Sequence, residues 1–192
     1  IDNQAFKAVQ IGGPSGGCLT SEHLDTPLDF DSLGALGAMV GSGGLVVMND
    51  STCMVKIAHY FMSFTQHESC GKCVPCREGT RQMLELLEDI IEGRGTEETL
   101  ELLDEVGQAV KITSLCGLGK SAPNPVLSTM RFFRDEYLAH VRAGYCPTRS
   151  CKALTPISID PETCRGCTLC KRVCPVGAIS GEVKQVHRID PM

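Results

Sequence analysis

Three cysteines in one short loop constrain this chain more than any other feature of its sequence. Cys70, Cys73 and Cys76 follow the spacing C-x2-C-x2-C within the segment ESCGKCVPCR. Such a loop directs three thiols into one small volume, which neither a hydrophobic core nor an ordinary catalytic site requires. A cubane [4Fe–4S] cluster does require it, because the cluster takes four cysteine thiolates. The loop therefore predicts an iron–sulfur site that needs one more, remote thiol.

Cys116 is the best candidate for that fourth ligand. It lies in the segment SLCGLG, where glycines permit a close approach of the backbone to a bulky inorganic group. We expect Cys70, Cys73, Cys76 and Cys116 to bind one [4Fe–4S] cluster. The alternative is a structural zinc ion on the same four sulfurs, since zinc also accepts tetrahedral thiolate ligands.

A second cysteine run near the end of the sequence favours iron. Cys164, Cys167, Cys170 and Cys174 follow C-x2-C-x2-C-x3-C-P, the run of bacterial ferredoxins. In two-cluster ferredoxins the fourth cysteine of such a run ligates the other cluster, yet no second run follows before Met192. Either the ferredoxin module is cut short, which we prefer and which would weaken or abolish its cluster, or Cys174 closes a single cluster in an unusual geometry.

A third group of residues has the composition of a zinc site. Cys146 and Cys151 are close in sequence, and His140 lies six residues before Cys146. With Cys53 as the fourth member they would give the tetrahedral Cys and His ligands that structural zinc prefers. His187 is an alternative to His140, and inert buried cysteines with a solvated histidine are the alternative to any metal.

The remaining composition limits the protein class. Twelve cysteines in 192 residues, with no signal peptide at the start, indicate metal ligands in a reducing cytoplasm better than secreted disulfides. The net charge of −5 and the lack of a basic run give no support to nucleic-acid binding. No apolar stretch of about 18 residues predicts a membrane span. The absence of an initiator Met at Ile1 suggests a piece of a larger polypeptide, and Cys18 is expected to be a small core residue.

Residues 1–50 read as part of a sheet. Segments 7–11 and 45–48 predict short strands, and the glycine-rich segments 12–17 and 41–44 predict turns. Two strands are too few for an independent sheet, which again suggests a missing upstream part. A phosphate cradle at the first glycine segment lacks the G-x-x-x-x-G-K-[ST] pattern, so close packing against a neighbour is the better interpretation.

Residues 51–143 read as helices. Four amphipathic helices with short links predict an antiparallel bundle that holds the first cluster on its connections, with expected bounds 52–64, 77–91, 97–110 and 124–141. Ser51 or Thr52, Thr96 and Asn124 are the expected N-caps. The fold class is therefore α+β, with a helical domain followed by a hinge and a truncated ferredoxin-like tail over residues 144–192.

Taken together, these motifs resemble one known family. The segment ESCGKCVPCREGT over residues 68–80, with SLCG over 114–117, looks like the cluster-binding domain of the NADH- and FMN-binding flavoprotein subunit of complex-I-type dehydrogenases. The segment VQIGGPSGG over residues 9–17 resembles the latter half of the β-grasp domain that precedes it. The appended ferredoxin run resembles the variant in NAD(P)-linked, often electron-bifurcating, iron hydrogenases and related formate dehydrogenases.

This resemblance implies an electron relay within a multisubunit complex. FMN and NAD(P) would bind in an upstream domain, and single electrons would pass from the flavin through the first [4Fe–4S] cluster to other clusters. The implied partners are a small iron–sulfur subunit, a hydrogenase or dehydrogenase subunit, and ferredoxin. We expect the zinc to fix the hinge between the helical domain and the tail. The rival hypothesis is a zinc-rich interaction module without a redox role.

Overall fold

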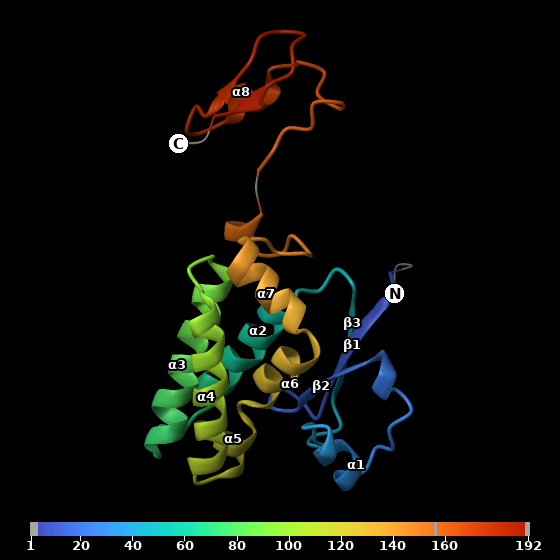
Figure 1. Ribbon diagram of the computed structural model, residues 1–192, viewed down its shortest axis with the longest axis vertical. Coiled ribbons are helices and arrows are strands. Elements are labelled where there is room, and N and C mark those ends of the chain that lie inside the picture. The colour runs from blue at the N-terminus through green and yellow to red at the C-terminus, as the bar shows by residue number, and fades with distance from the viewer. Residues whose placement is uncertain (1–3, 156, 191–192) are drawn as a thin grey trace. The chain divides into compact units, whose positions relative to one another are not determined.

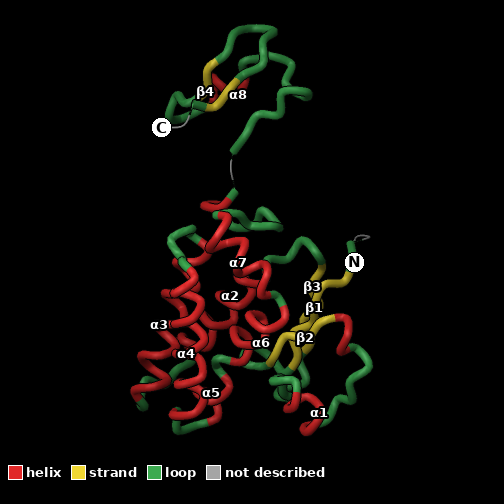
Figure 2. Tube along the Cα trace, viewed as in Figure 1, coloured by secondary structure: helices red, strands yellow, loops and turns green. Residues whose placement is uncertain are grey.

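The chain forms two compact units, residues 1–155 and residues 156–192. The structure is a computed structural model, and it describes residues 4–155 and 157–190. The first unit combines a small sheet with a larger group of helices (Figures 1 and 2). The second unit contains the ferredoxin-type run.

The sheet has three antiparallel strands in the order β2-β1-β3, with Val9 of the central strand opposite Leu19 and Val47. Their bounds are β1 Phe6–Ile11, β2 Gly17–Thr20 and β3 Leu45–Asn49. The two predicted strands are therefore confirmed. The third, β2, was missed because its first residue, Gly17, falls within a segment that reads as a turn.

The two glycine-rich segments pack against each other. Gly12 and Gly13 have positive φ angles of 89° and 82°. A Cβ at Gly12 would lie 2.2 Å from the carbonyl oxygen of Met39, and one at Gly41 would lie 2.2 Å from the carbonyl oxygen of Gly12. The N–H of Gly12 also donates to the carbonyl of Gly44 at 3.1 Å. Close backbone approach explains these glycines, which is the packing role that the sequence favoured.

Two short helices connect the second and third strands: the 3-10 helix η1 (Ser21–His23) and α1 (Phe30–Ala35). Asp29 caps α1, since its carboxylate accepts the N–H of Ser32 at 2.7 Å. Helix α1 was not expected from the sequence, because it is short and has only one buried residue, Leu33.

The helical part of the first unit contains six α-helices and the 3-10 helix η2 (Lys152–Leu154) in the described residues 51–155. Their bounds are α2 Met54–His67, α3 Val74–Ile91, α4 Glu97–Thr113, α5 Gly117–Ser121, α6 Asn124–Phe132 and α7 Arg134–Ala143. Thr96 caps α4 as predicted, in a reciprocal capping box with Thr99. By contrast, α2 starts later than expected, with Cys53 at its N-cap position and without a side-chain cap.

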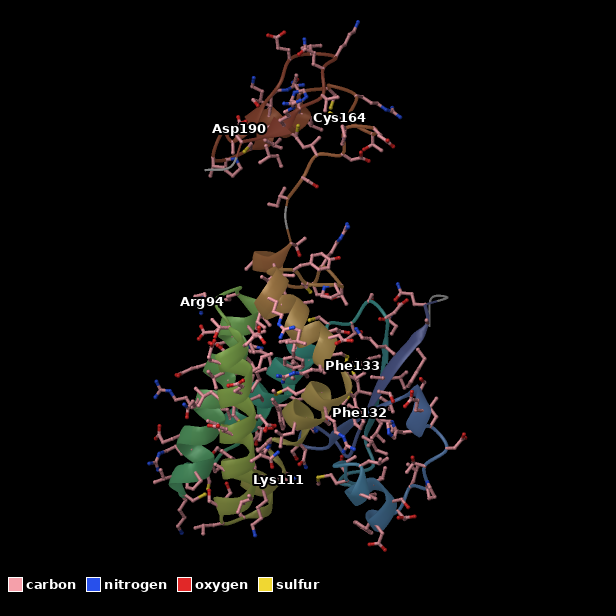
Figure 3. The ribbon with its side chains drawn as sticks, viewed as in Figure 1. Arg94, Lys111, Phe132, Phe133, Cys164 and Asp190 are labelled. Atoms are coloured by element: carbon pink, nitrogen blue, oxygen red, sulfur yellow. The ribbon has the colours of Figure 1, made fainter. Side chains whose placement is uncertain are left out.

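The predicted fourth helix is broken into α6 and α7 at Phe133, whose φ and ψ are −126° and 36°. This break has a packing reason. Phe132 packs against the apolar cluster around Ile11 and Leu33, whereas Phe133 packs against the cluster of Ala8, Cys18, Met48 and Met54. The break thus lets two consecutive residues, both labelled in Figure 3, enter two different apolar clusters.

The main core lies among the helices. It is built from fully buried side chains of α2, α3, α4, α6 and α7, with Met62, Met83, Leu87, Leu103 and Tyr137 among the largest. Helix α6 contacts both α2 and β2, and the N–H of Cys18 in β2 donates to Ser128 Oγ of α6 at 2.9 Å. Helix α6 therefore joins the sheet to the helices.

The second unit has little regular structure. Its described residues, 157–190, contain one short helix, α8 (Leu169–Val173), and a two-stranded antiparallel sheet of β4 (Ile179–Ser180) and β5 (Arg188–Ile189). No helix among the described residues of either unit has the length and apolar character needed to cross a membrane.

Candidate metal centres

The loop between α2 and α3 presents the three closely spaced thiols. Gly71 reverses the chain with a φ of 70°, and α3 begins earlier than predicted, at Val74. Cys73 is therefore the N-cap residue of α3, and Cys76 lies in its first turn. Partial positive charge at a helix N-terminus favours thiolates, so this placement suits anionic ligands.

Cys116 occupies the equivalent position on another helix, as the N-cap residue of α5. It lies within the turn that follows the end of α4 at Thr113. The four thiols line a single pocket of about 140 Å³, together with Glu68, Ser69, Lys72 and Leu118. Tertiary structure therefore brings the remote cysteine to the other three, as expected from the sequence. We call Cys70, Cys73, Cys76 and Cys116 the helical cluster site.

Gly119 allows this convergence. A Cβ at Gly119 would lie 2.5 Å from both Cβ and Oγ of Ser114 and 3.1 Å from Cβ of Cys76. No side chain can be accommodated at such distances unless its neighbours shift. The glycine thus lets α5 approach the start of α3, which places Cys116 beside the other thiols.

A single zinc ion and a cubane cluster differ in the sulfur spacing that they require. Four thiolates on one zinc ion lie about 3.8 Å apart, because the Zn–S bond is about 2.3 Å and the geometry is tetrahedral. Among the described residues, Cys53, His140, Cys146 and Cys151 form a group whose ligand atoms all lie within 4.8 Å of one another. A cubane holds its thiolates farther apart than a single ion does, and the four thiols of the helical cluster site line one pocket of about 140 Å³.

Hydrogen bonds and burial act in opposite directions on two of these thiols. The backbone N–H groups of Leu115 and Cys76 lower the pKa of Cys73. Burial raises the pKa of Cys76, and the nearby thiolates add repulsion, while a hydrogen bond from Ser69 opposes both effects. A positively charged iron core would relieve this mutual repulsion.

The two basic residues beside the loop have different environments. Lys72 is exposed on the pocket rim. Arg77 donates to the carbonyl of Gly71 at 2.7 Å and pairs with Glu78 at 2.8 Å. Arg77 therefore closes the cysteine loop on itself.

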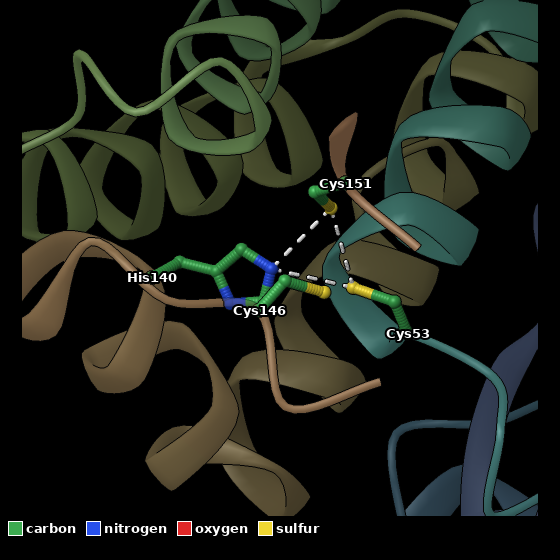
Figure 4. A group of neighbouring side chains, drawn as sticks. All are labelled: Cys53, His140, Cys146 and Cys151. Atoms are coloured by element: carbon green, nitrogen blue, oxygen red, sulfur yellow. Dashed lines mark hydrogen bonds between the residues drawn. The ribbon is translucent and has the colours of Figure 1, made fainter. Parts of the chain in front are cut away.

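A second site is formed by Cys53, His140, Cys146 and Cys151, all four of them buried, and we call it the thiol–histidine site (Figure 4). The Sγ atoms of Cys53 and Cys151 are 3.8 Å apart, and each lies 3.4 Å from His140 Nε2. Tetrahedral zinc with three sulfurs and one nitrogen requires edges of about 3.5–3.8 Å. Cys53, His140 and Cys151 therefore have the spacing that zinc requires, and the ligand atom of Cys146 lies within 4.8 Å of theirs.

The imidazole of His140 is oriented for this role. Its Nδ1 lies 2.7 Å from the carbonyl oxygen of Glu136, one helical turn earlier. That bond places the proton on Nδ1 and leaves Nε2 directed at the thiols, which is the usual arrangement for a metal-bound histidine.

The charges of the thiol–histidine site also favour a cation. The hydrogen bond between Cys53 and Cys151 lowers the pKa of Cys53, whereas burial acts to raise it. The same contact and burial raise the pKa of Cys151. Burial disfavours the charged imidazole, yet the hydrogen bonds to Cys53 and to the carbonyl of Glu136 raise the pKa of His140 to about 9. Without a metal, protons must neutralise these thiols, and a bound cation would replace them.

The four cysteines of the ferredoxin-type run lie in the second unit, around α8. Cys164 Sγ accepts the N–H of His187 at 3.5 Å, and Gly166, with a φ of 65°, would place a Cβ 2.5 Å from the nitrogen of Gln185. Backbone N–H groups, chiefly that of Val176, lower the pKa of Cys174. The cysteine loop therefore packs against the segment that leads into β5, in the unit where Figure 3 labels Cys164 and Asp190.

Three polar residues near these sites were not singled out from the sequence. Ser69 contacts Cys76, Ser114 is buried beside Gly119, and Glu136 orients His140. For Ser69 the only signal was its position inside the cysteine loop. For Glu136 the signal was its spacing of four residues from His140.

Known proteins share these features. Residues 56–140 match the family described as NADH-ubiquinone oxidoreductase-F iron-sulfur binding region, and residues 157–180 match the family described as 4Fe-4S binding domain.

Among curated proteins, the chain is 51% identical over 186 residues to the NADP-reducing hydrogenase subunit HndC of Solidesulfovibrio fructosivorans, covering 97% of this chain and 38% of that protein. It is 45% identical over 136 residues to the F subunit of the NADH-quinone oxidoreductase of Mycobacterium bovis, covering 71% and 31%. The chain thus spans about a third of the length of these relatives.

A crystal structure of an NAD+-reducing [NiFe]-hydrogenase in the H2-reduced state matches with a TM-score of 0.66 and 37% identity, covering 72% of this chain and 24% of that one. The match supports a mixed fold of helices and a small sheet. On this evidence the chain corresponds to a C-terminal part of such subunits: its residues 56–140 belong to the NADH-ubiquinone oxidoreductase-F iron-sulfur binding region, and its residues 157–180 belong to the 4Fe-4S binding domain family.

Proposed function

We propose that this chain is the electron-relay segment of an NAD(P)H- and FMN-dependent oxidoreductase, in which single electrons come from a flavin in an upstream domain and leave toward other clusters or ferredoxin. The observation that carries this proposal is the convergence of Cys70, Cys73, Cys76 and Cys116 on one pocket of about 140 Å³. A [4Fe–4S] cluster bound there supplies one-electron transfer. The oxidoreductase names of the relatives support the same reading.

The residues around the pocket suit this role. Cys76 is buried, whereas Cys70 and Cys116 are exposed, so the site lies at the edge of the helical part. The neighbouring apolar side chains Val74 and Leu115 are 58% and 77% exposed. An edge with little protein cover shortens the distance to a redox partner, and exposed apolar side chains suit a protein contact there.

The finer assignments are part of the same proposal. Residues 1–50 would be the latter half of a β-grasp domain, residues 51–143 an antiparallel four-helix bundle in which α6 and α7 together form the last member, and residues 144–192 a hinge with an incomplete ferredoxin-like domain. The partners would be other subunits of a cytoplasmic redox complex, including a small iron–sulfur subunit and a hydrogenase or dehydrogenase subunit. The parent enzyme would be an electron-bifurcating hydrogenase.

We further propose that the thiol–histidine site binds one structural zinc ion. The distances of 3.4 Å and 3.8 Å among Cys53, His140 and Cys151 support this assignment. Cys146 and Cys151 belong to the last segment of the first unit, which ends at residue 155. The zinc would thus fix the chain just before the ferredoxin-like tail begins.

Counting iron and zinc per chain tests these assignments. Anaerobically purified chain should contain about four irons from the helical cluster site, about eight if the tail is also loaded through Cys164, Cys167, Cys170 and Cys174, and one zinc. Cys116→Ser should lose the irons of the helical cluster site, whereas Cys164→Ser should lose only the irons of the tail. Cys146→Ser should lose zinc and keep iron.

Visible absorption separates the relay from its rival. Cubane clusters are brown, so the relay requires a broad band near 400 nm that dithionite bleaches. If the protein is colourless and has zinc on Cys70, Cys73, Cys76 and Cys116, the electron-relay proposal is wrong and the chain is a zinc-rich interaction module.

A further inference from the structure

Cys76 is distinguished from the other thiols of the helical cluster site by its serine neighbours. It is only 5% exposed, and Ser69 Oγ lies 3.3 Å from its sulfur. On the other side, Ser114 and Cys76 face each other across Gly119, where a Cβ would lie 2.5 Å from Ser114 Oγ and 3.1 Å from Cys76 Cβ.

The direction of the Ser69 hydrogen bond follows from counting donors. The N–H of Gly71 donates to Ser69 Oγ at 3.3 Å, so the hydroxyl oxygen already acts as an acceptor. A cluster-bound cysteine is a thiolate and has no proton to give. The single hydroxyl hydrogen of Ser69 therefore points at the sulfur of Cys76.

Ser114 provides a second hydroxyl close to Cys76. It is 3% exposed, and its Oγ has no hydrogen-bond partner among the described residues. A buried hydroxyl without a partner destabilises a fold, because it loses its hydrogen bonds to water and gains none in return. Cys76 lies across Gly119 from this hydroxyl, and its thiolate would be an acceptor for the hydroxyl in the loaded chain.

We propose that Ser69, supported by Ser114, tunes the reduction potential of the bound cluster by donating hydrogen bonds at its Cys76 corner. This inference rests on the proposed function, because it needs a cluster on the four thiols. Reduction adds one electron and thus one negative charge to the cluster. Donors aimed at its sulfurs stabilise the reduced form more than the oxidised form, and so raise the potential.

The test is a redox titration of the full chain followed by EPR spectroscopy. The signal that Cys116→Ser abolishes identifies the cluster of the helical site. Its midpoint potential should shift to more negative values in Ser69→Ala, and by a smaller amount in Ser114→Ala. Ser69→Thr keeps the hydroxyl and should restore the wild-type value.

Ser121→Ala is the matched control. Its hydroxyl lies on α5, near Cys116, and donates to the carbonyl of Gly117 at 2.8 Å and not to a sulfur. Its removal should leave the midpoint potential unchanged, so a shift there as large as in Ser69→Ala would overturn the inference.

The outcomes separate this inference from the proposed function. A wild-type chain that takes up no iron overturns both. A loaded cluster whose potential is the same in wild type and Ser69→Ala, or moves to positive values, overturns the tuning role alone. Partial loading does not affect the result, since a midpoint potential is independent of the fraction loaded. If Ser69→Ala binds no iron, the midpoint potential of Ser114→Ala tests the inference instead: a more negative value supports it, and an unchanged value overturns it.

Discussion

The carboxylate of Glu136 on α7 accepts the backbone N–H of Met54, the first residue of α2, at 3.1 Å. Cys53 precedes Met54 and provides no side-chain cap of its own, so α2 is capped by a residue from another helix. The same carboxylate pairs with Lys7 of β1, whose Nζ also donates to the carbonyl of Thr52 at 2.6 Å. The Glu136 carboxylate thus fixes the backbone beside Cys53 and the adjacent strand, and the backbone carbonyl of the same residue orients the ring of His140.

Glu136→Ala should lower the free energy of unfolding of the metal-loaded chain by about 2–3 kcal/mol. A lost helix cap costs about 1 kcal/mol, and the remainder comes from leaving the largely buried Lys7 without its partner. Anaerobic denaturant unfolding followed by circular dichroism measures this change. Glu97→Ala is the control. Glu97 of α4 pairs at the exposed surface with Arg142, which lies on α7 as Glu136 does. Such exposed pairs contribute less than about 1 kcal/mol. Equal losses in the two variants would contradict the special role of Glu136.

Gly119→Ala should reduce the iron content of the helical cluster site and destabilise the chain by about 1–3 kcal/mol, because the new Cβ overlaps Ser114 and crowds Cys76. Iron analysis and the absorbance near 400 nm measure the first effect, and denaturant unfolding the second. Gly117→Ala lies two residues earlier in the same helix and meets no atom within 4 Å. That control should keep its iron. A fully loaded Gly119→Ala chain would show that α5 can shift without displacing Cys116.

Thr96→Ala should destabilise the chain by about 1 kcal/mol, since Thr96 and Thr99 satisfy each other's backbone N–H groups at the start of α4. The iron content of the helical cluster site should not change, because this end of α4 is opposite to the end that leads into Cys116. Thermal unfolding of the loaded chain measures the loss. The prediction is wrong if the transition is the same as in wild type.

Cys18 should resist alkylation in the folded chain. Burial raises its pKa from 9.0 to about 12. Because the pKa is raised, the thiolate fraction at pH 8 falls about a thousandfold relative to an exposed thiol, and the thiolate is the reactive form. Peptide mapping after iodoacetamide treatment at pH 8 should therefore find Cys18 modified in urea but not in the native protein. Native labelling at the rate of the unfolded chain would contradict this prediction.

Local patterns in the sequence were sufficient for the elements whose signals are complete over a few residues. The sequence predicted the strand β1 and the cap at Thr96, and it showed the cysteine spacings directly. Backbone propensity, side-chain capping and ligand spacing are all short-range properties. Patterns failed where packing decided the outcome. The break at Phe133 depends on two apolar clusters of the sheet region, and β2 is a strand only because its partner β1 lies beside it.

The sequence by itself determined which residues could ligate metal, since thiols at such spacings have few other uses. Only the tertiary structure decided which of them meet. It brought Cys116 to the cysteine loop through the close approach at Gly119, and it joined Cys53 to His140 and Cys151 across 87 and 98 residues. The physical reason is that a metal site depends on distances between side chains, and those distances are set by how helices pack and not by the order of residues along the chain.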